Sequence, residues 1–320
     1  MMLRRAIQVC CLIFAGLTCV PLVAAFDPPG PEARSQAIGR TDSLPETLRR
    51  ALEPAEAFLP IATPATGDWL DAHKEAGQTF DQFVASHPNR PDKSRYRIYL
   101  LPLGSLDSEG CPALEKLQSF AAAFFQMEVK VLPVAAIDEQ TFSPRINQYT
   151  KRRQILTTDV LAYLGGRLPS DAFCLLGVTM EDLYPAPSWN YVFGQASLRN
   201  RVGVYSFVRY DPDFFGEPRQ PEYQALILRR SCKVLAHETA HMFGLAHCIY
   251  FHCLENGSNN LAESDRKPVD LCPVCLRKLQ DSVGFDVVKR YEDLARFYRA
   301  EGWTAESEWV RHRLATINDH

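Results

Sequence analysis

The sequence predicts an α/β fold built on a mixed sheet, with one long helix that carries the candidate site. Between residues 95 and 180, strand-like apolar runs alternate with helical patterns, which favours a largely parallel sheet. Two further alternating runs, at 189–198 and 201–210, are separated by only two residues. This spacing predicts an antiparallel hairpin and therefore an exposed strand at one edge of the sheet.

Length and charge limit the class of protein. A chain of 320 residues that is 46% hydrophobic can bury one catalytic-size core with extensions. Its 35 Lys and Arg residues against 38 Asp and Glu residues give a net charge of −3, without a long basic run. We therefore expect no nucleic-acid partner, and the charge balance indicates no other partner.

The N-terminus has the composition of an export signal. Arg4 and Arg5 precede an apolar run at 9–20, and small residues at 23–25 follow Pro21. We predict that residues 1–25 are a cleaved signal peptide and that the protein is periplasmic or secreted. The alternative is an uncleaved N-terminal anchor, although the run is shorter than the roughly 20 apolar residues that span a bilayer. No later segment is long and apolar enough to span, so we expect no stable membrane span after cleavage.

The remaining elements follow in chain order. Residues 26–47 contain four prolines and predict a polar tether, and residues 48–93 predict a helical N-terminal arm. We expect an upper catalytic subdomain at 94–247 and a small lower subdomain at 248–320. The predicted strands and helices of these subdomains are strands at 95–104, 128–134 and 172–180, helices at 113–126 and 157–168, the hairpin, a long helix at 222–244, and helices at 283–302 and 304–317.

A histidine motif lies in the long predicted helix. His237 and His241 are one helical turn apart, so both imidazoles leave the same face and can bind one ion. Glu238 is offset around the helix and can hold a metal-bound water without being a ligand. Gly244 can end the helix and let His247 return as a third ligand. Three histidines leave one position for water, which is typical of a catalytic zinc.

Gly244 and His247 extend the histidine motif and make it specific. With 17 Gly and 8 His in 320 residues, a chance match at both Gly244 and His247 has a probability of about one in 750. The extended pattern is the signature of metzincins.

Cysteines follow the last histidine directly. The chain has ten cysteines, of which three lie in the predicted signal and the other seven are an odd number concentrated toward the C-terminus. Two close pairs match a closed zinc site with four thiolate ligands: Cys248, Cys253, Cys272 and Cys275. The alternatives are disulfides, which an exported protein permits, or His252 in place of one cysteine.

The segment "HETAHMFGLAHC", followed by Cys253 and "CPVC", resembles the archaemetzincins, which are metzincin-type zinc peptidases. The resemblance covers about residues 65–290 and includes "VGVYSFVRY" and "GSNNLAESDRKPVDLCPVCLRKLQ". It implies a metzincin-like zincin fold with a twisted sheet, an active-site helix and a cleft above a small C-terminal subdomain that holds a second zinc. It also implies a catalytic zinc on His237, His241 and His247, Glu238 as the general base and a structural zinc on the four cysteines.

One position departs from this family. Two residues after the second cysteine, where archaemetzincins have a methionine, this chain has Glu255. A buried carboxylate would be costly beside an apolar floor, or could hold the distal N–H of a histidine. We expect instead that the turn directs Glu255 to solvent and that another side chain fills the gap.

These features predict a zinc-dependent peptidase with two zinc ions, and we expect it to act as a monomer on a peptide or protein substrate. The exposed hairpin strand could align an extended peptide by strand addition, or be an ordinary solvated edge. Two alternatives come from other classes: a zinc-bound interaction module with little turnover, for which Glu255 is the sequence hint, and a zinc hydrolase of non-peptide amides. The presence of Glu238 argues against the interaction module, since a structural zinc site needs no carboxylate beside its first histidine.

Overall fold

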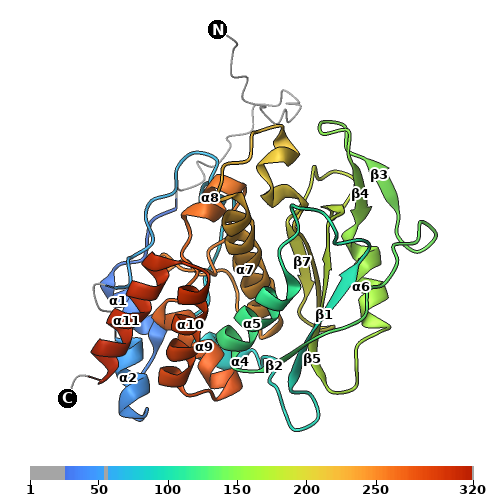
Figure 1. The fold of residues 1–320 in the computed structure, drawn as a ribbon. Coiled ribbons are helices and arrows are strands. Elements are labelled where there is room, and N and C mark those ends of the chain that lie inside the picture. Colours follow the sequence, from blue (N-terminus) through green and yellow to red (C-terminus); the bar gives the residue numbers. More distant parts are fainter. Residues whose placement is uncertain (1–25, 54–56, 319–320) are drawn as a thin grey trace, which may run out of the picture.

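A computed structural model describes residues 26–53 and 57–318 of the chain (Figure 1). The predicted signal at 1–25 lies outside the described residues. Within them, no helix has the length and apolar character that crossing a membrane requires.

The main sheet is mixed, as predicted. Its five strands lie in the order β2-β1-β5-β8-β7, and the first four run parallel. The antiparallel partner of β8 is β7, so the predicted hairpin is confirmed and β7 forms one edge of the sheet. The strands are β1 (Arg97–Leu103), β2 (Glu128–Val131), β5 (Ala172–Thr179), β7 (Gly194–Ser197) and β8 (Val202–Ser206).

Helices cover both faces of this sheet (Figure 1). The three helices are α5 (Leu114–Phe125) and α7 (Tyr223–Met242) on one face and α6 (Thr157–Gly165) on the other. Because side chains alternate along a strand, β1 contributes to both cores. Ile98 and Leu100 belong to the cluster that includes α5 and α7 residues, whereas Tyr99 and Leu101 belong to the α6 cluster. This packing fixes α7, and the predicted site on it, against the sheet.

A second, smaller sheet and several short helices were not predicted. The small sheet has the order β3-β4-β6, and its strands of three or four residues are too short to show a period in the sequence. The unpredicted elements are α1 (Pro31–Ile38), β3 (Pro144–Ile146), β4 (Arg153–Leu156), β6 (Asp182–Tyr184), η1 (Val208–Tyr210), η2 (Pro212–Phe215), α8 (Leu261–Arg266) and α9 (Pro273–Val283).

The other helices were predicted. The helical arm contains α2 (Glu46–Leu52), α3 (Trp69–Ala72) and α4 (Phe80–Ala85), and the two C-terminal helices are α10 (Val287–Ala300) and α11 (Thr304–Asn318).

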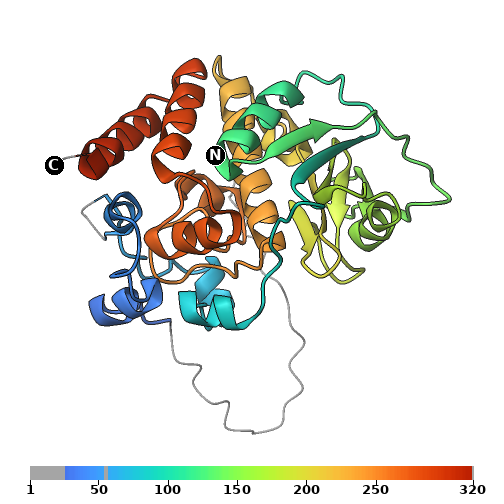
Figure 2. The same cartoon turned by 90° about the horizontal axis from the view of Figure 1, so that it is seen from below.

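The segment 26–47 differs from the expected tether. Pro31 stands at the start of α1, where its missing N–H costs no hydrogen bond, so the proline content is compatible with a helix. Ile38 is 4% exposed, and Arg277 of α9 donates hydrogen bonds to the carbonyl oxygens of Ile38 and Arg40. Figure 2 shows the blue N-terminal helices beside the orange α9. The segment is thus part of the packed structure.

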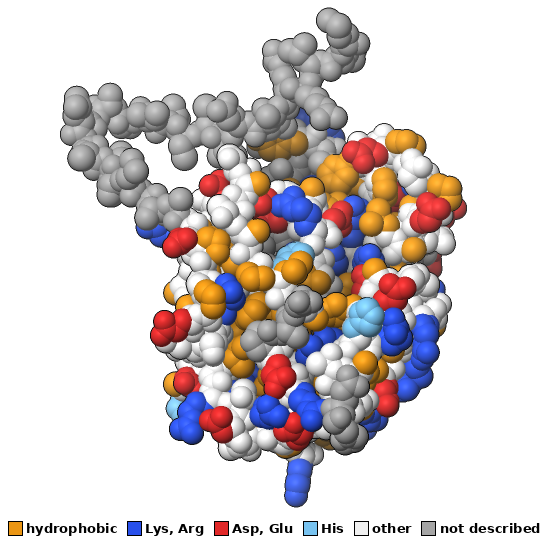
Figure 3. All heavy atoms as spheres, turned by 90° about the vertical axis from the view of Figure 1, so that its left-hand side faces the viewer, with side chains coloured by type: hydrophobic (Ala, Val, Ile, Leu, Met, Phe, Trp, Pro, Cys, Tyr) orange, Lys and Arg blue, Asp and Glu red, His pale blue; other side chains and the backbone are white. Residues whose placement is uncertain are grey.

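The face formed by the N-terminal helices and the C-terminal helices carries mixed charge. Figure 3 views this side of the molecule, and its basic and acidic side chains are interspersed with apolar ones. Several of these charges form exposed ion pairs, such as Arg49 with Glu46 and with Glu53. No basic stripe is visible among the described residues on this face.

A substitution at Ile38 tests whether the segment 26–47 is packed against α9. Ile38→Ala should lower the free energy of unfolding by about 2–4 kcal/mol, because it opens a cavity in a packed core. Ser35→Ala, on the exposed side of the same helix, is the matched control. Urea denaturation monitored by circular dichroism measures both, and equal stability of the two variants would show that 26–47 is a loose tether after all.

Candidate metal centre

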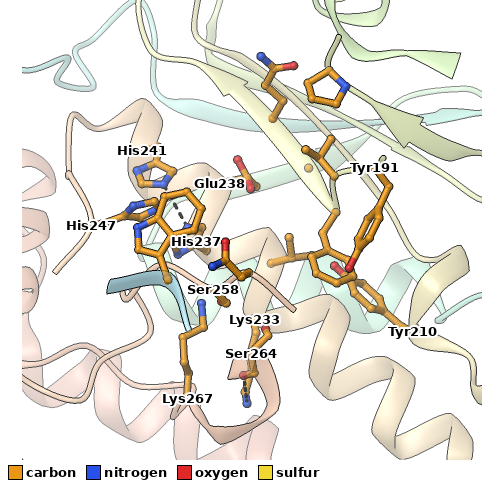
Figure 4. Close-up of a pocket in the computed structure, with 18 of the residues that line it drawn as sticks. Tyr191, Tyr210, Lys233, His237, Glu238, His241, His247, Ser258, Ser264 and Lys267 are labelled. Atoms are coloured by element: carbon orange, nitrogen blue, oxygen red, sulfur yellow. Dashed lines mark hydrogen bonds between the residues drawn. The ribbon is translucent and has the colours of Figure 1, made fainter. Parts of the chain in front are cut away.

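Helix α7 presents the predicted motif on one face. Its buried residues Leu235, Ala236 and Ala240 pack into the main core. His237 and His241, one turn apart, leave the helix together, and their ring centroids are 4.5 Å apart. Figure 4 shows both rings beside the carboxylate of Glu238 at the wall of a cleft.

The chain returns to this face immediately after the helix ends. Gly244 has φ +89°, a backbone conformation that residues other than glycine rarely adopt. A Cβ at this position would also lie 2.9 Å from Cβ of Pro88. The turn brings the ring of His247 to 5.2 Å from that of His237 and 5.1 Å from that of His241. The three histidines predicted from the sequence therefore meet at one place.

Each imidazole is oriented through its Nδ1 atom. The three acceptors are the carbonyl oxygen of Leu254 at 3.2 Å from His237, the carbonyl oxygen of Leu245 at 2.7 Å from His241, and Oε1 of Glu75 at 2.8 Å from His247. A carbonyl oxygen only accepts, so Nδ1 of His237 and of His241 must carry the hydrogen. The lone pair is then on Nε2, where a metal binds.

The spacing of these nitrogens fits a zinc ion. Nε2 of His241 lies 3.1 Å from Nε2 of His237, and ligand nitrogens of all three histidines lie within 4.8 Å of one another. Ligands at the usual Zn–N distance of 2.0–2.1 Å are about 3.3 Å apart in a tetrahedral site. Burial lowers the pKa of His237 and of His241, which favours the neutral form that binds metal.

Glu238 faces the same cleft from between the histidines and the edge strand β7 (Figure 4). Burial raises its pKa to about 7. A Cβ at Gly194 of β7 would lie 3.1 Å from Oε1 of Glu238, so glycine leaves room for the carboxylate. The cleft has a volume of about 600 Å³ and is also lined by Tyr191, Phe193 and Trp189.

The four cysteines predicted as zinc ligands form a second cluster, and its first member, Cys248, directly follows His247. Their sulfur atoms lie within 4.8 Å of one another, all four side chains are buried, and Sγ of Cys248 is 3.6 Å from Sγ of Cys272. A disulfide requires about 2.05 Å, so the described cysteines are free thiols rather than bridges. Four thiolates at about 2.3 Å from zinc are about 3.8 Å apart, which this cluster fits. His252 is not part of the cluster.

The expectation for Glu255 was wrong. Its side chain is 0% exposed, and among the described residues neither carboxylate oxygen has a hydrogen-bond partner. The turn closes through a hydrogen bond from the backbone N–H of Cys248 to the carbonyl oxygen of Glu255, at 2.8 Å. This places Oε1 of Glu255 4.0 Å from Nδ1 of His237. Burial raises the pKa of Glu255 well above its ordinary value.

Two residues of the N-terminal arm were missed as members of the site. Glu75 accepts hydrogen bonds from both His247 and Nε1 of Trp69, each at 2.8 Å, and these contacts lower its pKa, with the bond to His247 contributing most. The ring of Trp69 stacks on the ring of His73. It also forms a T-shaped contact with the ring of His247, and the centroids of these two rings are 5.1 Å apart. Because Glu75 lies 172 residues before His247, no local pattern in the sequence connects them.

The chain is similar to several known proteins. The model of Peptidase family M54 matches residues 157–281. Archaemetzincin-1 of Homo sapiens is 35% identical over 312 residues, which cover 85% of this chain and 63% of that protein. The crystal structure of an archaemetzincin from Methanopyrus kandleri is 31% identical, with a TM-score of 0.46, and the match covers 60% of this chain and 97% of that one.

The match to Archaemetzincin-2 of Mus musculus extends over 278 residues and covers 77% of that protein. At 39% identity over 78% of its own length, the chain belongs to the archaemetzincin family of zinc metallopeptidases.

Proposed function

We propose that the chain hydrolyses peptide bonds in the cleft beside α7, with a catalytic zinc on His237, His241 and His247 and with Glu238 as the general base. The observation that carries this proposal is the convergence of the three imidazoles beside a partly buried carboxylate in one cleft. A zinc ion held by these three histidines would supply Lewis acidity to the attacking water and to the carbonyl under attack.

The protein's own contribution is a proton acceptor at the correct place. Glu238 does not belong to the histidine cluster, so its carboxylate is available to take the proton of the attacking water. Because burial raises the pKa of Glu238, the same group can accept this proton and then return it to the leaving amine.

The edge strand β7 supplies a surface for the substrate. Gly194 and Gln195 of β7 line the cleft, and β7 has a strand neighbour on only one side in the described sheet. An extended peptide can pair with the free side by strand addition, which places a backbone carbonyl across the cleft from α7. We infer that the peptide binds in this way.

The cysteine cluster is proposed to hold a second, structural zinc, so that the chain binds two zinc ions. Because Cys248 directly follows His247, holding Cys248 also holds the third histidine of the catalytic site. The site is closed by four thiolates and has no position for a substrate.

Three further proposals rest on the sequence alone. They are export after cleavage of a signal at 1–25, action as a monomer, and division into upper and lower subdomains at about residue 247.

Glu238→Gln tests the mechanism directly. The amide keeps the volume but cannot take the proton, so peptide hydrolysis should fall by at least ~100-fold while zinc content stays the same. Elemental analysis and digestion of a peptide library measure the two quantities. Glu222→Gln, on the exposed end of α7, is the matched control. Wild-type rates in Glu238→Gln would disprove the assigned base, and a zinc-loaded wild type that cleaves no peptide would favour the interaction module.

Glu75→Gln tests whether the N-terminal arm supports the metal centre. Losing the charged acceptor of His247 should weaken zinc binding at the histidine site by about tenfold or more, the lower end of the usual effect of such partners. Competition with a chromogenic chelator measures the affinity, and Lys74→Gln, at the exposed neighbouring position, is the control. Unchanged affinity in Glu75→Gln would mean that this contact does not orient His247.

A further inference from the structure

Two lysines lie in the wall of the cleft. Lys233 is on α7, one turn before His237, and Lys267 directly follows α8. Lys233 is 5% exposed and Lys267 is 9% exposed, yet both line the cleft. Figure 4 shows the side chain of Lys267 extending toward the histidines, on the side of the cleft away from Tyr191 and Tyr210.

The hydrogen bonds of Lys267 leave part of its ammonium group available. Lys233 donates to the carbonyl oxygens of Ser264 at 3.2 Å and Asp265 at 3.0 Å. Lys267 donates to one carbonyl oxygen, that of Asn256 at 2.8 Å. Since an ammonium has three donors, Lys267 retains hydrogens for a ligand. Among the described residues, no carboxylate oxygen lies within 4.0 Å of either lysine nitrogen.

The carboxylates near Lys267 do not serve as acceptors for the remaining hydrogens of its ammonium group. Glu255 influences Lys267 electrostatically, but within the described part of the chain both of its oxygens lack a hydrogen-bond partner, and Glu255 is not among the described residues that line the cleft. Glu238 is the acid that lines the cleft, and its proposed duty is proton transfer. A buried ammonium without a full set of partners is costly, so an incoming anion at this wall would gain a charge-assisted hydrogen bond.

We propose that Lys267, with the positive charge of Lys233 in the same cleft, binds a carboxylate of the substrate. Lys267 is thereby a specificity-determining residue that makes the cleft prefer peptides with an acidic side chain, or a free C-terminal carboxylate, close to the cleaved bond. The inference rests on the proposed function for its substrate class, since it takes the cleft to be the peptide site.

The opposite wall supports this assignment. Tyr191, Phe193 and Trp189 supply aromatic surface, and Trp189 is 50% exposed. One wall is therefore apolar and the other cationic. A peptide bound along β7 would place an anionic group on the lysine side with its apolar groups toward the aromatic side.

The test measures binding rather than turnover. Zinc-loaded Glu238→Gln is titrated by calorimetry with four versions of one peptide, which carry Glu or Gln at one position and end in a free acid or an amide. The anionic member of at least one pair should bind about tenfold more tightly, the scale of one charge-assisted hydrogen bond. The Glu/Gln pair reports an acidic side chain, and the acid/amide pair reports a free C-terminus.

The same titrations in lysine variants assign the preference to a residue. Lys267→Met should abolish it, and Lys267→Arg should retain most of it because the positive charge is kept. Lys130→Met, on the exposed far-edge strand β2, removes one positive charge outside the cleft and should leave the preference intact. If Lys267→Met does not fold, Lys267→Gln replaces it, with thermal unfolding as the check.

Three results would overturn the inference. These are no measurable binding of any of the four peptides, equal affinity within both pairs, and a preference that survives the loss of the Lys267 charge. Failure of the proposed function would look different: wild type would cleave no peptide, while the affinity difference and its dependence on Lys267 would still be measured.

Discussion

The metal centre depends on how the chain returns to α7 after Gly244. Two of the three histidines of the cluster are oriented by backbone carbonyls of this returning segment, those of Leu245 and Leu254. The segment also carries His247 and the first two cysteines of the second cluster. Its closure by the hydrogen bond between Cys248 and Glu255 therefore sets the position of both candidate zinc sites at once.

This arrangement concentrates charged groups in a small buried region. Glu238 and Lys267 face the cleft, while Glu255 lies behind His237 without a hydrogen-bond partner. Burial raises the pKa of both acids and lowers that of Lys267 to about 8, so all three pKa values are shifted from their ordinary ranges while Lys267 stays mainly protonated at neutral pH. Perturbed groups of this kind gather where a protein performs chemistry, which agrees with membership in a peptidase family.

The sequence predicted the parts of the fold and site that follow from local spacing. The helical period placed His237 and His241 on one face, and cysteine spacing indicated the second cluster. Contacts over long distances were not predictable: Glu75 reaches His247 across 172 residues. The burial of Glu255 was predicted wrongly, because the inward direction of its side chain is decided by backbone hydrogen bonds within the turn. Likewise, the prolines of 26–47 suggested a tether, although Pro31 begins a packed helix.

We propose that one chain holds an open histidine-bound zinc and a closed cysteine-bound zinc. X-ray absorption at the zinc edge of the purified protein tests this most directly. We expect an average zinc environment of about two sulfur atoms at about 2.3 Å and about two nitrogen or oxygen atoms at about 2.0–2.1 Å, from two ions in equal amounts. A spectrum with only sulfur neighbours, or with none, would contradict it.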